Sequence, residues 1–406
     1  MKPFKKLICA LPLILLLEGC WDRTELNDLG LITAFALDKG KNNNVLVSVQ
    51  IVIPQNQSGG IASGGGGGGG GGGAMKRTTI RRAEGIDTAD ALSKLQRVIP
   101  RKQFWGQCKV FIFGEDLAKS GIQEQMDFLL RHPQPRERGL MFVSKGKAGD
   151  ALELFPPIER SSAEAIRKLS DLKIGMQVTM EQLSIMLKGE SKAAALPLLY
   201  ILPTTKSADP YQTIPYIFGT AVFKKDRMIG TISEDLTRGV LWINNEIREY
   251  TVTFKMKGAG RTGKEDSGNV SLKPIRAGIK LIPNIQGKQW SMTIKVITEG
   301  DIIQNGTVLN PMDPELLDQM NLAYQKDVTK RIQRALDEVQ HHLKADVFHF
   351  AREFHRKYPK QWEASKDRWD DIFPKVKVKV EVNTNITRTG NLNAPGGLPL
   401  EEVKEK

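Results

Sequence analysis

The sequence predicts an α+β fold built from three successive mixed α/β domains, with small sheets flanked by helices. Three observations lead to this prediction. Strand-like runs of β-branched residues alternate with segments of helical 3–4 apolar spacing through the first part of the chain. The last part has mostly strand-like runs, which predicts an antiparallel-rich C-terminal domain, and it also carries two long helical segments. The length of 406 residues agrees with two or three domains.

The chain opens with two predicted strands, 29–38 and 45–53, separated by an Asn-rich turn. Residues 55–74 follow, and they include ten consecutive glycines from Gly64 to Gly73. Such a segment buries too little apolar surface to order itself. A phosphate-binding loop would need single glycines at fixed offsets between a strand and a helix. We therefore expect 55–74 to form a flexible loop inserted within one domain.

Helices and strands then alternate as far as the middle of the chain. Asp87 is placed to cap a helix that Pro100 ends. The predicted elements here are helix 87–99, strand 109–114, helix 117–130, strand 140–143 and a mainly helical stretch 148–196, in which 176–188 is one helix. Residues 197–214 contain three prolines, so we expect a boundary there.

The last part begins with a predicted hairpin and is rich in strands. Asp313 and Pro314 are typical of a helix N-cap and first position, and an apolar stripe then continues from Leu316 to Leu343. We interpret this stripe as packing on the domain's own sheet, with a coiled interaction face as the alternative. The predicted elements are strands 216–223, 228–232, 249–257, 270–281, 290–299 and 376–382, and helices 235–244, 313–343 and 346–358.

These elements divide the chain into five segments. The prediction is a signal peptide over 1–19, an N-terminal α/β domain over 20–146, a mainly helical middle domain over 147–210, a C-terminal α+β domain over 211–390 and a disordered tail over 391–406.

The N-terminus predicts export and a lipid anchor. Three lysines precede an apolar run over 7–17, which is too short to span a bilayer but suits a signal peptide. The run ends in Leu17-Glu18-Gly19-Cys20, which resembles a bacterial lipobox although Glu18 replaces the usual small residue. In that motif the cysteine receives a diacylglycerol thioether and becomes the new N-terminus. Cys20 is therefore the predicted lipid-attachment residue.

The charge of the chain favours an anionic partner. Lys and Arg number 59 against 46 Asp and Glu, a net charge of +13, and removal of residues 1–19 with three lysines and one glutamate lowers it to +11. Export weighs against nucleic acid, and there is no basic stripe interleaved with aromatic residues. Anionic lipid headgroups or wall polymer are the expected partners, with an even spread of charge over solvated faces as the alternative.

We predict no catalytic, metal or cofactor site. Residues 258–264 have the spacing of a phosphate-binding loop, but Glu265 stands where Ser or Thr would ligate magnesium, so a hairpin loop is the better interpretation. The five histidines form no H-E-x-x-H motif, and the three cysteines are too few for a four-cysteine zinc site. Cys108 is expected to be a buried apolar residue rather than a nucleophile.

Each of two small motifs has both a structural and a recognition interpretation. Asp226-Arg227 lies between two predicted strands, as a recognition loop or simply as a tight turn. Arg238 and Trp242 stand four residues apart on a short helix, so they can stack on each other or contact a partner. We favour a structural role for both motifs.

Three blocks of residues resemble one known family in the same order along the chain. The first is Cys20-Trp21-Asp22, Glu25-Leu26 and the strand that ends at Asp38; the second is Gly219–Lys224, Asp226–Gly230, Thr237–Gly239 and Trp242; the third is Phe354, Lys357–Pro359, Trp362, Trp369 and Ile372–Pro374. They resemble the Ger(x)C, or GerAC, lipoproteins, the C subunits of bacterial spore nutrient-germinant receptors. The resemblance covers almost the whole mature chain, with the glycine tract as the main departure.

The resemblance implies a function without catalytic activity. It implies a lipoprotein on the outer face of the spore inner membrane, assembled with two integral membrane subunits, A and B, in a receptor for amino acids, sugars or nucleosides. It implies three α+β domains and no assigned germinant site, so Cys20 is the only functional residue it names. The alternatives are a substrate-binding lipoprotein of a transporter, which would need two similar lobes, and a secreted wall hydrolase, which would need a metal or carboxylate constellation.

Overall fold

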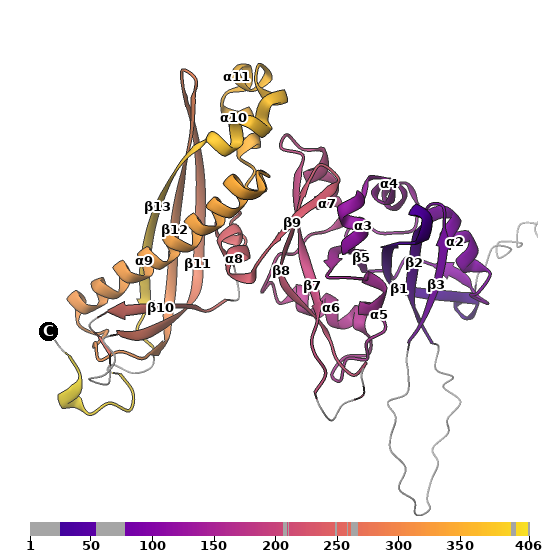
Figure 1. Ribbon diagram of the computed structural model, residues 1–406. Coiled ribbons are helices and arrows are strands. Elements are labelled where there is room, and N and C mark those ends of the chain that lie inside the picture. The colour runs from indigo at the N-terminus through magenta and orange to yellow at the C-terminus, as the bar shows by residue number, and fades with distance from the viewer. Residues whose placement is uncertain are drawn as a thin grey trace, which may run out of the picture.

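The computed structural model describes residues 25–53, 78–205, 209, 211–247, 250–257, 259–260, 267–390 and 395–404. In these residues a nine-stranded sheet and a four-stranded sheet stand side by side, each with its own helices (Figure 1). This arrangement confirms the predicted mixed α/β class, with sheets flanked by helices. Cys20 and the segment 55–74 lie outside the described residues.

The nine-stranded sheet combines a parallel centre with antiparallel edges. Its strands follow the order β3-β2-β1-β5-β6-β7-β8-β9, and β4 pairs with β1. β1, β5, β6 and β7 run parallel to one another, whereas β2 and β3 at one edge and β8 and β9 at the other pair antiparallel. The strands are β1 Leu29–Lys39, β2 Val45–Val52, β3 Thr78–Gly85, β4 Lys102–Phe104, β5 Val110–Gly114, β6 Leu140–Ser144, β7 Ala193–Ile201, β8 Pro215–Lys224 and β9 Arg227–Ile232.

Helices cover both faces of this sheet, which explains why the central strands are continuous apolar runs. All residues of β5 and β6 are buried. One face packs against α2 Thr88–Gln96, α3 Glu115–Ser120, α4 Gln123–Arg131 and α7 Met180–Lys188, and the other against α5 Ala148–Leu152 and α6 Ser162–Asp171.

The four-stranded sheet is built on a long hairpin. Its order is β10-β11-β12-β13, with β10 to β12 antiparallel and β13 parallel to β12. The strands are β10 Val252–Lys257, β11 Ser267–Gln286, β12 Gln289–Asn305 and β13 Lys377–Arg388, and the helices are α8 Glu234–Ile243, α9 Pro314–Leu336, α10 Phe350–Lys357, α11 Pro359–Glu363 and α12 Trp369–Ile372.

α9 crosses one face of this sheet obliquely (Figure 1). Asp313 caps it and Pro314 is its first residue, as predicted. Its stripe is fully buried at Met320, Tyr324, Val328 and Ile332, in one cluster with the inward side chains of β10 to β12. The interpretation of the stripe as packing on the domain's own sheet is therefore confirmed. A π-helix, Asp337–Leu343, follows α9.

Several predicted elements were wrong in their bounds. The helix 117–130 is two helices, because Gly121 adopts a left-handed φ of 122° between α3 and α4. Residues 193–196 belong to β7 rather than to a helix, because their all-apolar run pairs antiparallel with β8 on the sheet. The helix predicted from 176 begins at Met180, after a capping box of Thr179 and Gln182.

The predicted disordered tail was wrong for residues 395–404. There Val403 is buried, and the Lys404 N–H donates to the Val308 carbonyl at 2.8 Å. One apolar side chain and a short backbone pairing hold this segment, a signal too small to find in the sequence. The nine-stranded sheet contains strands from both sides of the predicted domain boundaries at 146/147 and 210/211. The division into three domains at these points therefore stays a prediction.

Candidate functional site

The predicted lipid-attachment residue, Cys20, lies only a few residues before the described chain begins at Glu25. The first element is a short 3-10 helix, η1, Leu26–Asp28, which leads directly into β1. None of the described helices is long and apolar enough to cross a membrane. Attachment at Cys20 stays a prediction.

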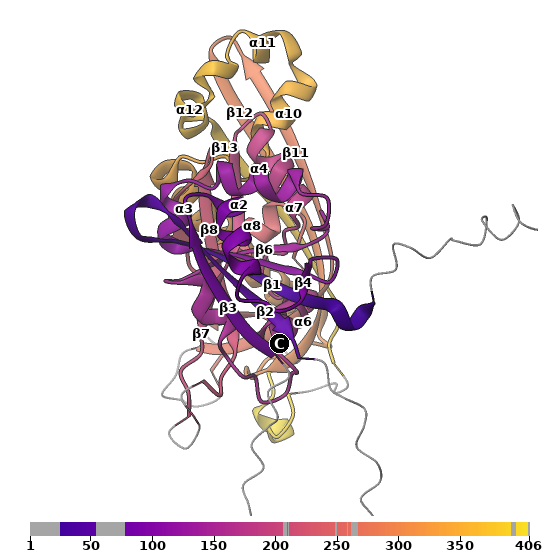
Figure 2. The same cartoon turned by 90° about the vertical axis from the view of Figure 1, so that its right-hand side faces the viewer.

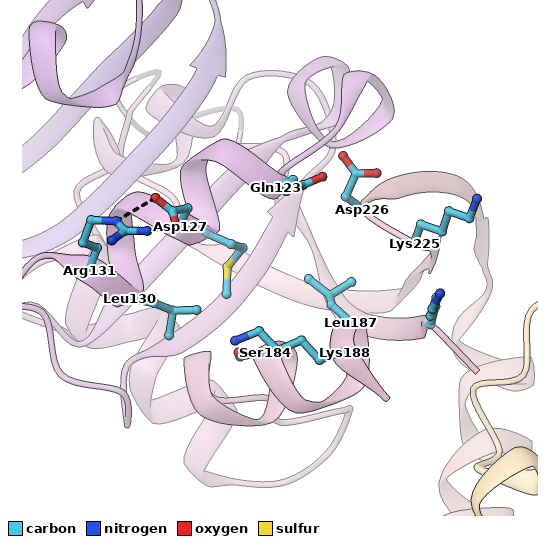
Figure 3. Close-up of a pocket in the computed structure, with 11 residues that line it drawn as sticks. Gln123, Asp127, Leu130, Arg131, Ser184, Leu187, Lys188, Lys225 and Asp226 are labelled. Atoms are coloured by element: carbon cyan, nitrogen blue, oxygen red, sulfur yellow. Dashed lines mark hydrogen bonds and ion pairs between the residues drawn. The ribbon is translucent and has the colours of Figure 1, made fainter. Parts of the chain in front are cut away.

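A hollow of about 760 Å³ is the candidate binding site on the described surface. α4, α7 and the turn between β8 and β9 form its walls (Figure 3). Met126, Leu130 and Leu187 supply apolar lining. The charged side chains around it are Asp127, Arg131, Lys188, Lys192, Lys225 and Asp226.

The β8–β9 turn is fixed to the body of the protein by its backbone. Lys225 has a left-handed φ of 56°, and its N–H donates to the Lys192 carbonyl at 2.5 Å. The carbonyl of Asp226 accepts the N–H of Ile122 at 3.0 Å. Gly121 has a φ of 122°, which side-chain-bearing residues rarely adopt, and a Cβ there would also lie 2.5 Å from the Asp226 carboxylate, so glycine suits the position where this turn meets α3. Asp226 thus has the structural role that we favoured, although its side chain also borders the hollow.

The hollow carries more basic than acidic groups. Asp127 and Arg131 form an ion pair of 2.7 Å one helical turn apart on α4, and this pair lowers the pKa of Asp127 (Figure 3). Within the described chain, Lys188, Lys192 and Lys225 have no acidic partner within ion-pair distance. A hollow of this kind suits an anionic group or an acidic side chain of a partner. No local motif predicts this hollow, because its walls come from three separate segments.

Arg238 does not stack on Trp242, so that interpretation was wrong. Its guanidinium lies 4.2 Å from the centre of the Tyr250 ring and pairs with Glu234. Trp242 is fully buried in the core between the two sheets. Arg238 thus joins α8 to the segment before β10 through the ring of Tyr250. Both residues are structural.

Asp38, which closes the first family-like block, has a role that the sequence did not predict. It is almost fully buried, and its two carboxylate oxygens accept the N–H groups of Ala148 and Gly149 at 2.7 and 2.9 Å. Burial raises the pKa of Asp38, and these two hydrogen bonds act against that rise. The carboxylate thereby ties the end of β1 to the first turn of α5.

Reactive residues offer no catalytic arrangement in the described part of the chain. Cys108 is buried as predicted, and desolvation raises the pKa of its thiol, which keeps it protonated. His342 pairs with Glu338 at 2.9 Å and His355 with Glu190 at 3.1 Å. The described residues contain no group of three or more His, Cys, Asp or Glu placed to hold a metal ion. Most of the loop 258–264 lies outside the described residues.

Comparison with known proteins covers both halves of the chain. Residues 22–201 match the model of the spore germination protein N-terminal domain, and residues 218–390 match that of the spore germination B3/GerAC-like C-terminal domain. In Bacillus subtilis strain 168, spore germination protein KC is 28% identical over 94% of this chain and 95% of its own length. Spore germination protein YndF is 28% identical over 96% and 97%, and spore germination protein B3 is 20% identical over 97% and 100%.

A solved structure has the same fold. The crystal structure of the GerBC protein matches 87% of this chain and 96% of its own chain, with a TM-score of 0.54 and 16% identity. None of these relatives is named for a catalysed reaction, in agreement with the prediction of no enzymatic activity. The two domain models stand in the order and at the positions of the blocks around Asp38, Gly219 and Trp369. The chain therefore belongs to the GerAC-like, or Ger(x)C, family of spore germination proteins.

Proposed function

We propose that this chain is the lipid-anchored C subunit of a spore nutrient-germinant receptor. A diacylglycerol on Cys20 holds it at the outer face of the spore inner membrane, where it acts with the A and B integral membrane subunits in nutrient-triggered germination. One observation carries the proposal. The lipobox-like sequence ends at Cys20, which would be the first residue of the processed chain. The match to the N-terminal domain model of the family begins two residues later, at residue 22.

The anchor is consistent with the described part of the chain. The lipobox cysteine stands just before the folded body, so the anchor would keep the nine-stranded sheet close to the bilayer. Two acyl chains bind a bilayer far more firmly than one, at about 0.8 kcal/mol per buried CH₂ group.

The two alternative functions fit the structure less well. A substrate-binding lipoprotein with two similar lobes would need two matching halves, whereas here a nine-stranded sheet with a parallel centre and antiparallel edges stands beside a mostly antiparallel four-stranded one. A wall hydrolase would need a metal or carboxylate constellation, and the described residues hold no such metal group.

The anchor is tested by Cys20→Ala, with Cys108→Ala as the matched control. Sporulating cells are fed a radiolabelled fatty acid, and the protein is then recovered and fractionated. We expect the label and the membrane partition to be lost in Cys20→Ala and kept in Cys108→Ala, because Cys108 is buried and far along the chain. Label retained in Cys20→Ala would contradict the anchor.

The receptor role is tested in spores that lack this gene and its closest paralogues. We expect slower germination on at least one nutrient. Restoring the wild-type gene should restore the response. Normal germination of the multiple deletion on every nutrient would refute the receptor assignment.

A further inference from the structure

The four-stranded sheet has one covered and one uncovered face. Along β12, Met292, Ile294 and Val296 are buried beneath α9, whereas Lys295 and Ile297, which alternate with them, are exposed. The same alternation continues in β10 and β13. Residues of the described chain that point away from α9 are thus largely open to solvent. We call this surface the outer face.

The outer face is strongly basic. Its basic residues are Lys255, Lys257, Lys273, Arg276, Lys280, Lys295, Lys377, Lys379 and Arg388, and its acidic residues are Glu299, Asp301 and Glu381. Lys280 and Lys295 lie directly opposite each other on neighbouring strands. Like charges in that position destabilise a sheet, so the fold by itself gives no reason to keep them. Glu381 pairs with both Lys295, at 3.4 Å, and Lys379, at 2.7 Å.

Isoleucines stand out among these charges. Ile275, Ile297 and Ile303 are 54%, 59% and 56% exposed on the strands that carry the lysines. Ile297 faces Gly278 on one side and Asn383 on the other, so no large neighbour covers it. Basic groups mixed with exposed apolar side chains are typical of surfaces that lie on anionic membranes, because headgroups attract the charges and the acyl boundary accepts the apolar groups.

The outer face and the start of the described chain are on the same side of the molecule. In Figure 1 α9 lies in front of β11 to β13, so the outer face points away from the viewer. After the 90° turn of Figure 2 that direction is to the right, and η1 at the start of the chain also lies on the right. A membrane reached by Cys20 just before η1 can therefore also lie against the outer face.

We propose that the outer face of the four-stranded sheet docks on the anionic phospholipid surface of the membrane and orients the protein on it. The inference rests on the proposed lipid anchor for its geometry, but the docking itself needs only the sheet. β12 has 17 residues, which at about 3.3 Å per residue gives a strand long enough to rest on many headgroups. Each Lys or Arg held near an anionic surface strengthens binding about fivefold.

The test uses the mature chain 20–406 with Cys20→Ala, so that no lipid contributes. Sedimentation with vesicles of phosphatidylglycerol and phosphatidylcholine is compared with vesicles of phosphatidylcholine alone. The test variant is Arg276→Gln/Lys280→Gln/Lys377→Gln, and the control is Lys326→Gln/Lys330→Gln/Arg334→Gln on the exposed side of α9. Both triples remove the same charge from exposed positions, and thermal unfolding checks that both fold.

We expect binding to the anionic vesicles only, weakened at least about tenfold in the outer-face triple and less than about twofold in the α9 triple. Equal weakening in both triples would show that overall charge and not this face is responsible, and would overturn the proposal. Failure of the parent chain to bind anionic vesicles would also overturn it, leaving an acidic protein surface as the occupant. The anchor is judged separately by fatty-acid labelling at Cys20, so either proposal can fail alone.

Discussion

The carboxylate of Asp38 accepts the backbone N–H of Gly149 at 2.9 Å, across a gap of 111 residues in the sequence. Asp38 ends the first strand of the nine-stranded sheet, and Gly149 lies in the first turn of α5 on the face of the sheet that α6 also covers. The second oxygen takes the N–H of Ala148 at 2.7 Å. One side chain thus satisfies two N–H groups at a helix end that would otherwise be buried without partners.

Asp38→Ala should therefore cost stability. The substitution leaves both N–H groups unpaired in a buried position, which we expect to lower the free energy of unfolding by about 2–4 kcal/mol. Urea unfolding followed by circular dichroism measures the loss. Asp116→Ala, in the exposed first turn of α3, is the control and should cost less than about 1 kcal/mol. Equal effects of the two substitutions would contradict this role of Asp38.

A substitution at Gly114 would also disturb the carboxylate of Asp38, because Gly114 lies against it. A Cβ at Gly114 would lie 2.0 Å from the carboxylate of Asp38, so Gly114→Ala must displace the buried acid or the strand. We expect a loss of about 1–3 kcal/mol in the free energy of unfolding. Gly278→Ala is the matched control, because nothing lies within 4 Å of its Cβ position on the outer face. A tolerated Gly114→Ala would show that Asp38 moves freely.

The apolar stripe on α9 predicts that substitutions at nearby positions differ strongly in their effect on the free energy of unfolding. Met320 is fully buried against the sheet, whereas Leu322 on the same helix is 55% exposed. Met320→Ala should lower the free energy of unfolding by about 2–5 kcal/mol through lost contacts and a cavity. Leu322→Ala should change it by less than about 0.5 kcal/mol. Similar losses at both positions in thermal unfolding would refute the packing of this stripe on its own sheet.

Elements with local sequence signals could be predicted, whereas elements made of uniformly apolar residues could not. Helix caps and periodic stripes are local, so Asp313, Pro314 and the spacing from Leu316 to Val328 were enough to predict α9. The same holds for the hairpin of β8 and β9. Runs that are apolar throughout carry no period, and this is why residues 193–196 were assigned to a helix although they form part of β7.

Contacts between distant segments could not be predicted from the residues alone. Asp38 was noticed in its motif, but its partners Ala148 and Gly149 lie in a helix of five residues with no sequence signal of its own. The hollow beside Lys225 and the basic outer face arise only when separate segments meet in the fold. The composition predicted an anionic partner; the strand register showed which surface concentrates the charge.

Because Asp346 is buried, we expect the protein to lose stability as the pH rises from about 4 to about 6. Its oxygens accept the N–H groups of Phe350 and Ala351 and the indole N–H of Trp369, yet burial raises its pKa from 3.8 to about 6. The folded state thus holds a proton that the unfolded chain releases. Stability from this group is full below about pH 4 and falls as pH approaches 6, by about 3 kcal/mol in total. In Asp346→Asn, urea unfolding across this range should lack that fall; an unchanged pH profile would contradict the prediction.

His349, three residues after Asp346, should give the opposite pH dependence of stability. Burial lowers its pKa from 6.5 to about 4, and Arg352 adds to this effect. The folded state therefore favours the neutral ring, and its stabilising contribution is present above pH 6.5 and lost as pH falls towards 4, by about 3 kcal/mol. The residue has a left-handed φ of 63°, which asparagine tolerates, so His349→Asn removes the titration while keeping the backbone. We expect the variant to lose less stability than the wild type between pH 7 and pH 4. His341→Asn, at an exposed position, is the control; if it alters the profile as much as His349→Asn does, burial of His349 is not the cause.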